Sequence, residues 1–142
     1  CVKSFGGAVQ SGHNVGIRTD LSNSINGIRI KDVSADMYLL ESTAKLNCGK
    51  DYKVDYLTEN FGNFTENVSF KGVIGNNSFV WVASKNGLES GKTTTTGSKT
   101  ISVGQDINIS GMHNLMISAT INSSDSDMSD NMRNRMIEII GC

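Results

Sequence analysis

The sequence predicts an all-β fold, an antiparallel β-sandwich, on three observations. Apolar side chains alternate with polar ones along several short stretches, which is the two-residue period of a half-buried strand. Glycine and asparagine turn signals separate these stretches, and no amphipathic crossover helix of adequate length lies between them. The chain has 142 residues, which is the size of one domain with one hydrophobic core.

The clearest pair of predicted strands lies near the middle of the chain. Tyr52, Val54 and Tyr56 fall on one side of an extended backbone, and Asp55 falls on the other side. An Asn- and Gly-containing turn follows at 59–63, after which the alternation resumes. We therefore expect two antiparallel strands here, with one face packed and the other, which carries Asp55, exposed to water.

Further stretches have the same period or the β-branched and aromatic composition of strands. In the stretch 32–40 we expect an extended chain, with Val33, Met37, Leu39 and Leu40 available for the core. Trp81 is the only tryptophan, and we interpret it as a core residue. Asn86-Gly87 has the composition of a turn. The other expected strands are 15–19, 28–31, 79–83, 93–103, 107–109 and 115–121.

The segment 132–140 fits two patterns. Met132, Met136 and Ile140 recur every four residues, which a helix would place on one face. Arg135 and Ile137 belong to an alternating pattern, as in a strand. We favour the strand, because everything before it is β and a sandwich needs a closing strand.

Composition divides the chain into two regions. Residues 1–27 are rich in glycine and poor in apolar residues, and we expect an extended N-terminal arm or edge strand that lies against its own domain or a neighbouring copy. Residues 28–142 form the predicted sandwich.

Charge and hydropathy limit the possible partners. The 13 Lys and Arg residues balance 14 Asp and Glu residues, which argues against nucleic acid as a partner. No apolar run is long enough for a membrane span.

Asn-x-Ser/Thr sequons are frequent for a chain of this size. Five of them, mostly in predicted turns, favour an exported, extracellular protein with N-linked glycans. The chain begins at Cys1, which we interpret as a processed or trimmed start. The candidate glycosylation sites are Asn63, Asn67, Asn76, Asn108 and Asn122.

The sequence has three cysteines, an odd number, at Cys1, Cys48 and Cys142. Because two of them lie at the ends of the chain, our preferred hypothesis is that at least one bridges subunits. One internal bridge with a free thiol, and a lipid-modified Cys1, are the alternatives.

No catalytic centre is expected. Asp125, Asp127 and Asp130 place hard oxygen ligands in one loop, which is a weak candidate for Ca²⁺, but the spacing lacks the glycine and terminal glutamate of an EF-hand. We interpret the loop as a solvated acidic turn. His13 and His113 have no second ligand at zinc spacing. We expect no metal, no cofactor and no enzyme activity.

Several short motifs resemble the CARDB group, the cell-adhesion-related, immunoglobulin-like domains of archaeal and bacterial surface proteins. The motifs are 49–54 (GKDYKV), 58–63 (TENFGN), 88–92 (LESGK) and 125–133 (DSDMSDNMR). The resemblance covers 28–140, and neither the first 27 residues nor the cysteines belong to it. It implies a seven-stranded immunoglobulin-like sandwich at the cell surface that acts as a spacer or assembly module without catalysis.

From these observations we expect a secreted structural subunit. It would assemble with copies of itself into a cell-surface polymer, such as a filament, pilus, sheath or surface layer, by strand addition and intersubunit disulfides. The alternative is an extracellular adhesion or carbohydrate-binding module, which would need a row of exposed aromatic residues. Aromatic residues make up only 6% of the chain, and most of them lie at predicted core positions.

Overall fold

The structure, a computed structural model, describes residues 12–17, 24–90, 94–122 and 131–142, with 94–96 described by their backbone alone. The described part of the chain contains ten strands and no helix, which confirms the all-β prediction. The strands are β1 (Val15–Ile17), β2 (Ile28–Asp32), β3 (Met37–Tyr38), β4 (Thr43–Asn47), β5 (Asp51–Asn60), β6 (Glu66–Ile74), β7 (Phe79–Leu88), β8 (Thr94–Ser102), β9 (Gly111–Ile121) and β10 (Met132–Ile140).

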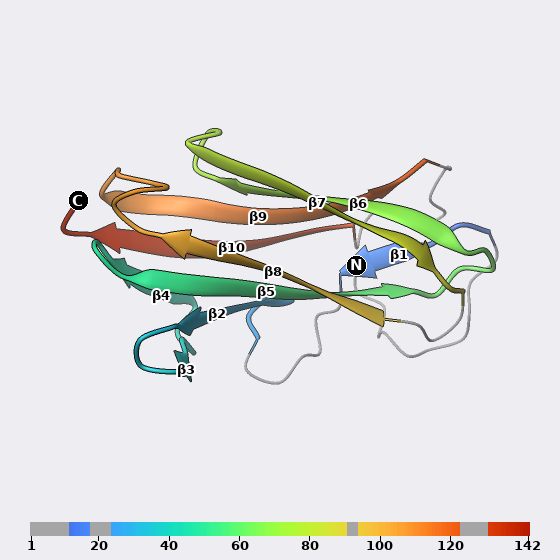
Figure 1. Cartoon of the computed structure of the whole chain (residues 1–142), viewed down its shortest axis with the longest axis horizontal. Coiled ribbons are helices and arrows are strands. Elements are labelled where there is room, and N and C mark those ends of the chain that lie inside the picture. Colours follow the sequence, from blue (N-terminus) through green and yellow to red (C-terminus); the bar gives the residue numbers. More distant parts are fainter. Residues whose placement is uncertain (1–11, 18–23, 91–93, 123–130) are drawn as a thin grey trace.

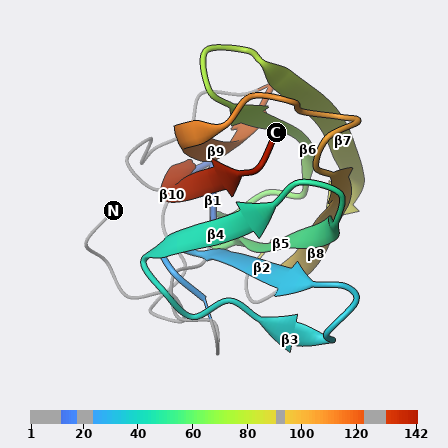
Figure 2. The same cartoon turned by 90° about the vertical axis from the view of Figure 1, so that its left-hand side faces the viewer.

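The strands form two five-stranded sheets that pack face to face (Figures 1 and 2). In the first sheet, β5 pairs with β8 along one edge and with both β1 and β2 along the other, and β3 lies beyond β2. The second sheet has the order β4-β10-β9-β6-β7. All pairs of named strands are antiparallel except β4 with β10, which is parallel. The predicted sandwich is therefore present with one parallel pair.

The inner faces of the two sheets supply the core. Tyr52, Val54 and Tyr56 of β5 are each at most 1% exposed, as their alternation predicts. The main partners across the sandwich are Val68, Phe70 and Ile74 of β6, Leu115, Ile117 and Ala119 of β9, and Ile137 and Ile139 of β10.

Two aromatic residues lie over glycines on neighbouring strands. Trp81 is 8% exposed, which confirms it as a core residue, and it pairs with Gly72. Tyr56 pairs with Gly97 in the same way. A Cβ atom on either glycine would lie 2.2 Å from a ring carbon, so each ring occupies the space that a side chain would need.

The last segment is strand β10, as predicted. Its inward side chains include Arg135, Ile137 and Ile139, all buried. Met132 and Met136 are 47% and 40% exposed on the outer face. A spacing of four keeps residues on one face of a strand as well as on one face of a helix, because four is a multiple of two. The four-residue pattern therefore did not indicate a helix.

The prediction of a continuous extended chain over 32–40 is wrong. Residues 33–36 form a turn, after which the two-residue strand β3 pairs back onto β2. This hairpin projects from the body of the sandwich (Figure 2), so Val33, Met37 and Leu40 are 45%, 65% and 62% exposed. Of the residues in this stretch that we expected in the core, only Leu39 packs against it, as a partly buried residue.

The predicted turn at Asn86-Gly87 is also wrong. Both residues lie inside β7, where the pairing with β6 shifts by one residue between Glu66 and Val68. Gly87 has a positive φ of 69°, and its N–H donates to the Asn67 side-chain oxygen. The Asn-Gly pair therefore forms a β-bulge, which requires the same left-handed backbone as a tight turn.

Part of the segment 1–27 lies within this sandwich. Val15–Ile17 is the buried edge strand β1, paired with residues 58–60 of β5. Just before it, the backbone of Asn14 and Gly12 accepts hydrogen bonds from Phe61 and Asn63. Residues 1–11 lie outside the described residues, as do 18–23.

Candidate assembly surface

Strand β7 forms an open edge of the second sheet. It pairs with β6 on one side, and no described strand pairs with its other side. Trp81 points into the sandwich, whereas Val80 and Val82 point outward and are 40% and 77% exposed. A long edge strand with unpaired backbone groups and exposed apolar side chains is a template for pairing with another strand.

The outer face of the second sheet continues this apolar surface. Val73 of β6 pairs with Val80 on one side and with Met116 of β9 on the other, so the three side chains lie side by side across three strands. Met112 and Met136, on β9 and β10, are 53% and 40% exposed on the same face. We call these residues, with Val82, Met132 and Ile140, the methionine face.

Two of the other edges, β8 and β4, carry a lysine. β8 contributes Lys99 to the first sheet's edge, and the short strand β4 presents an exposed Lys45. Lysine on an edge strand disfavours further pairing, because a second strand would bury its charge. In β7 the segment 79–84 contains no charged residue.

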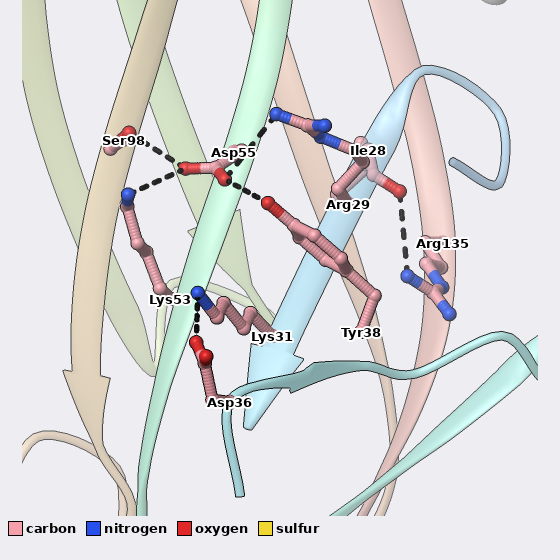
Figure 3. A network of polar contacts seen from close by, with 9 residues as sticks. All are labelled: Ile28, Arg29, Lys31, Asp36, Tyr38, Lys53, Asp55, Ser98 and Arg135. Atoms are coloured by element: carbon pink, nitrogen blue, oxygen red, sulfur yellow. Dashed lines mark hydrogen bonds and ion pairs between the residues drawn. The ribbon is translucent and has the colours of Figure 1, made fainter. Parts of the chain in front are cut away.

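The opposite face of the sandwich carries a polar cluster around Asp55 (Figure 3). Asp55 is 2% exposed, which corrects the prediction that this side of β5 is exposed to water. Its carboxylate accepts a 2.7 Å hydrogen bond from Ser98 and a 3.4 Å one from the Tyr38 hydroxyl, and lies 3.6 Å and 3.8 Å from Arg29 and Lys53. The β2–β3 hairpin brings Tyr38 over the carboxylate, so the cluster fastens that hairpin to β5.

Two more charged groups have structural partners. Lys50 donates a 2.6 Å hydrogen bond to Asp32, and with the Ser34 hydroxyl it lowers the pKa of Asp32 to about 2. Arg135 is 1% exposed and donates to backbone carbonyls of Ile28 and two later residues. Burial lowers the pKa of the Arg135 guanidinium. We interpret all three clusters as parts of the framework.

Two of the three cysteines pair within the chain, and the bridge between subunits that we expect from the sequence stays a prediction. Cys48, directly after β4, and Cys142, directly after β10, form a disulfide within the chain. It joins the ends of the two parallel strands, which lie at the same end of the sandwich (Figure 1). Cys1 lies outside the described residues. Any bridge between subunits would therefore use Cys1, unless the internal disulfide opens.

All five predicted glycosylation sites are exposed. Asn63 lies in the β5–β6 loop, Asn76 in the β6–β7 turn and Asn108 in the loop before β9. Asn67 lies on the outer side of β6, and Asn122 directly follows β9. The sequence therefore placed each asparagine where an enzyme can reach it.

The structure brings together no metal site within the described residues. No group of three or more His, Cys, Asp or Glu side chains there is arranged to hold a metal ion. Asp125, Asp127 and Asp130 lie outside the described residues. His13 contacts the Glu66 carboxylate and stacks on Phe64, with 4.3 Å between ring centroids, so it helps to fasten the N-terminal segment to the sandwich.

Sequence reasoning missed the β7 edge and the methionine face. The composition of 79–83 predicted a strand buried on both sides, whereas only Trp81 is buried there. One signal was available: Val80 and Val82 have the phase opposite to Trp81, so they had to lie on the other face. The edge position itself depends on strand order, which alternation does not encode.

The fold is an all-β sandwich with an open edge at β7. In comparison with solved structures, this fold is similar to that of CARDB domains. The crystal structure of the CARDB domain of a Pyrococcus furiosus protein, in complex with di-metal ions, matches 90% of this chain and 89% of its own with a TM-score of 0.56 and 10% identity. The solution structure of that domain gives 0.52 at 9% identity, over 80% of this chain and 94% of its own.

The C-terminal domain of Wzt has a similar fold, with a TM-score of 0.54 and 11% identity over 81% of this chain and 71% of its own. No family model matches the sequence, and no curated protein gives a significant match. The CARDB resemblance predicted from the sequence is thus confirmed for the fold. The described residues also contain no helix with the length and apolar character needed to cross a bilayer.

Proposed function

We propose that this chain is an extracellular structural domain that joins copies of itself into a cell-surface polymer through the open edge of β7. The observation that supports it most is the uncharged segment 79–84, with Val80 and Val82 exposed on an edge that no described strand covers. Pairing by the backbone provides affinity there, and the valines provide apolar contact. The exposed sequons and the internal disulfide suit a chain that works outside the cell.

The donor strand in this proposal comes from a neighbouring copy. In the first arrangement the donor is the part of the N-terminal arm at residues 1–11, whereas residues 12–17 pair within the chain's own sandwich. Pairing of β7 with the β7 strand of a second copy is the other arrangement that uses the same edge. Both arrangements bury Val80 and Val82. A chain that lacks residues 1–11 distinguishes between the two arrangements.

Charge placed on the edge tests the proposal. Val82→Lys should raise the concentration needed for assembly at least tenfold, because pairing would bury the ammonium group. Val33→Lys is the control, since Val33 is a valine in the turn between β2 and β3, away from β7, and is 45% exposed. Sedimentation velocity and negative-stain microscopy of the oxidised full chain give the measurement.

The outcomes are distinct. The proposal fails if the unaltered chain stays monomeric at millimolar concentration, or if Val82→Lys assembles as readily as Val33→Lys. A chain lacking 1–11 that loses assembly identifies the arm as donor. A truncated chain that still assembles, while Val82→Lys does not, identifies β7 pairing with β7.

The disulfide between subunits that we expect from the sequence would be formed by Cys1, since Cys48 and Cys142 pair with each other. In oxidised preparations the unaltered chain should give a covalent dimer on non-reducing electrophoresis, and Cys1→Ser should abolish it. Cys48 and Cys142 serve as the internal control, since their bridge should persist in both proteins. A purely monomeric band from the unaltered chain would show that no disulfide joins the subunits. It would not contradict assembly by strand addition.

The adhesion or carbohydrate-binding alternative receives less support. It would need aromatic residues in an exposed row. Of the aromatic side chains that the structure describes, only Phe64 is exposed, at 50%, and it stacks on His13.

A further inference from the structure

A hollow of about 480 Å³ lies on the methionine face, beside the β6–β7 turn. Its apolar lining includes Val73, Met112 and Met116, and its polar lining includes side chains of the turn. An apolar floor with amide groups at one rim suits a molecule that has both C–H faces and hydroxyl groups.

One glycosylation sequon lies on the rim of this hollow. Asn76 and Asn77 both line it, and Asn76-Asn77-Ser78 is a complete acceptor sequence. Asn114, on β9, brings a third side-chain amide to the same hollow. A sugar attached to Asn76 therefore starts at the hollow and needs no linker to reach it.

The turn that carries Asn76 is open to an enzyme after folding. Gly75 and Asn77 both have positive φ, of 54° and 64°, which reverses the chain within 75–78 and leaves Asn76 and Ser78 exposed. Two of the other sequons, although exposed, have a side chain that is hydrogen-bonded within the folded chain. The Asn67 oxygen accepts a bond from a backbone N–H, and the Ser110 hydroxyl, in the sequon of Asn108, is bonded to the backbone of Cys142.

We propose that Asn76 carries an N-linked glycan whose first sugars lie in this hollow and cover Val73, Met112 and Met116. The Asn76 Nδ2 atom forms a bond to the anomeric carbon of a lipid-phosphate-linked oligosaccharide. The anomeric carbon–oxygen bond to the phosphate breaks, the lipid phosphate leaves, and Nδ2 loses one proton. The C–H faces of the sugar pack on the methionines, and its hydroxyl and N-acetyl groups bond the Asn77 and Asn114 amides.

The glycan would cover one end of the methionine face and leave the exposed edge residue Val82 uncovered. Val82 borders a separate hollow, of about 540 Å³, in which Lys71 is the lining residue shared with the first. Glycosylation of Asn76, like the proposed function, requires export of the chain. It does not depend on whether β7 joins copies of the chain.

Methionine oxidation tests the inference on the full chain secreted from a eukaryotic host that N-glycosylates. Peptide mass spectrometry gives the occupancy of each sequon and the rate at which hydrogen peroxide converts each methionine to the sulfoxide. We expect Asn76 to be occupied and Met112, 53% exposed in the bare chain, to oxidise several-fold more slowly than in Ser78→Ala. That variant removes the acceptor sequence and keeps the Asn76 side chain.

Internal and matched controls separate a local effect from a general one. Met132, 47% exposed on the same face and outside the hollow, should oxidise at the same rate in both proteins. Asn108→Gln removes another sequon and should leave Met112 protected. The inference is overturned if Asn76 is unoccupied in the secreted chain, or if an occupied Asn76 leaves the Met112 rate equal to that of Ser78→Ala.

Discussion

Arg135 joins the two sheets through their interior. Its guanidinium donates to the carbonyl of Ile28 on β2 and, at 2.7 Å and 2.8 Å, to the carbonyls of Leu39 and Glu41 in the link from β3 to β4. Leu39 and Glu41 lie outside the named strands, where their carbonyls accept from this guanidinium. A single long cation therefore ties the β3–β4 link to the interior of the sandwich through charge-assisted hydrogen bonds.

We expect Arg135→Met to lower the free energy of unfolding by about 2–4 kcal/mol, because three carbonyl contacts are lost and the apolar side chain satisfies none of them. Urea unfolding followed by Trp81 fluorescence gives the value. Met136→Ala, the next residue and 40% exposed, should cost less than about 0.5 kcal/mol. Equal losses in the two variants would contradict the structural role of Arg135.

Asp32 makes folding sensitive to acid. Its folded pKa is about 2, against 3.8 for the unperturbed group, because Lys50 and Ser34 donate to the carboxylate. The folded state thus favours the charged form, so this contribution to stability is present above about pH 4 and is lost as the pH falls toward 2.

Asp32→Asn removes that dependence. Urea midpoints of both proteins should differ most near pH 7, where Asp32→Asn is the less stable, and should converge between pH 4 and pH 2. A difference that stays constant down to pH 2 would show that the pair with Lys50 contributes nothing to the acid response.

Strand β7 contains a glycine whose backbone conformation is left-handed. Gly87 lies in the bulge with a φ of +69°, and an added Cβ atom would meet no other atom within 4 Å. Any penalty for a larger residue therefore comes from the backbone and not from crowding.

Gly87→Ala should destabilise the protein by about 1–2 kcal/mol, and Gly87→Asn by less, because asparagine adopts the left-handed region more readily than alanine. Chemical denaturation of the two variants gives the comparison. If alanine and asparagine are equally well tolerated, the bulge does not require that conformation in solution.

At the scale of the whole molecule, the disulfide determines how the chain carries tension. Cys48 and Cys142 are bonded across 94 residues of sequence, so β5 to β10 lie in a closed loop. Force applied at the two ends of the chain passes from the N-terminal part to Cys48 and then directly to Cys142. Only β1 to β4 lie on that path.

Force spectroscopy with handles on both ends should therefore release on the order of 150 Å in the oxidised protein, at about 3.3–3.6 Å per extended residue before Cys48. The Cys48→Ala, Cys142→Ala double variant should release on the order of 480 Å. Equal extensions for the two proteins would show that the bridge does not form. The disulfide excludes β5 to β10 from the path of the force, which suits a structural role.

Alternation along the chain determined much of the result by itself. It predicted the all-β class and the inward set of β5, because side-chain direction in a strand follows from position alone. Residue type predicted the core position of Trp81, and the sequons, which we expected mostly in turns, are exposed. The same local rules could not tell a bulge from a turn at Asn86-Gly87, since both use a left-handed residue.

Strand order was decided only in three dimensions. The tertiary structure made β7 an edge, paired Cys48 with Cys142 and buried Asp55 under Tyr38, because each of these joins residues distant in sequence. In the tertiary structure, Met132 and Met136 lie on the outer face of the second sheet. Asn76 and Met112 line the same hollow. Short-range periodicity specifies which way a side chain points, and only the packing of the sheets decides what it meets there.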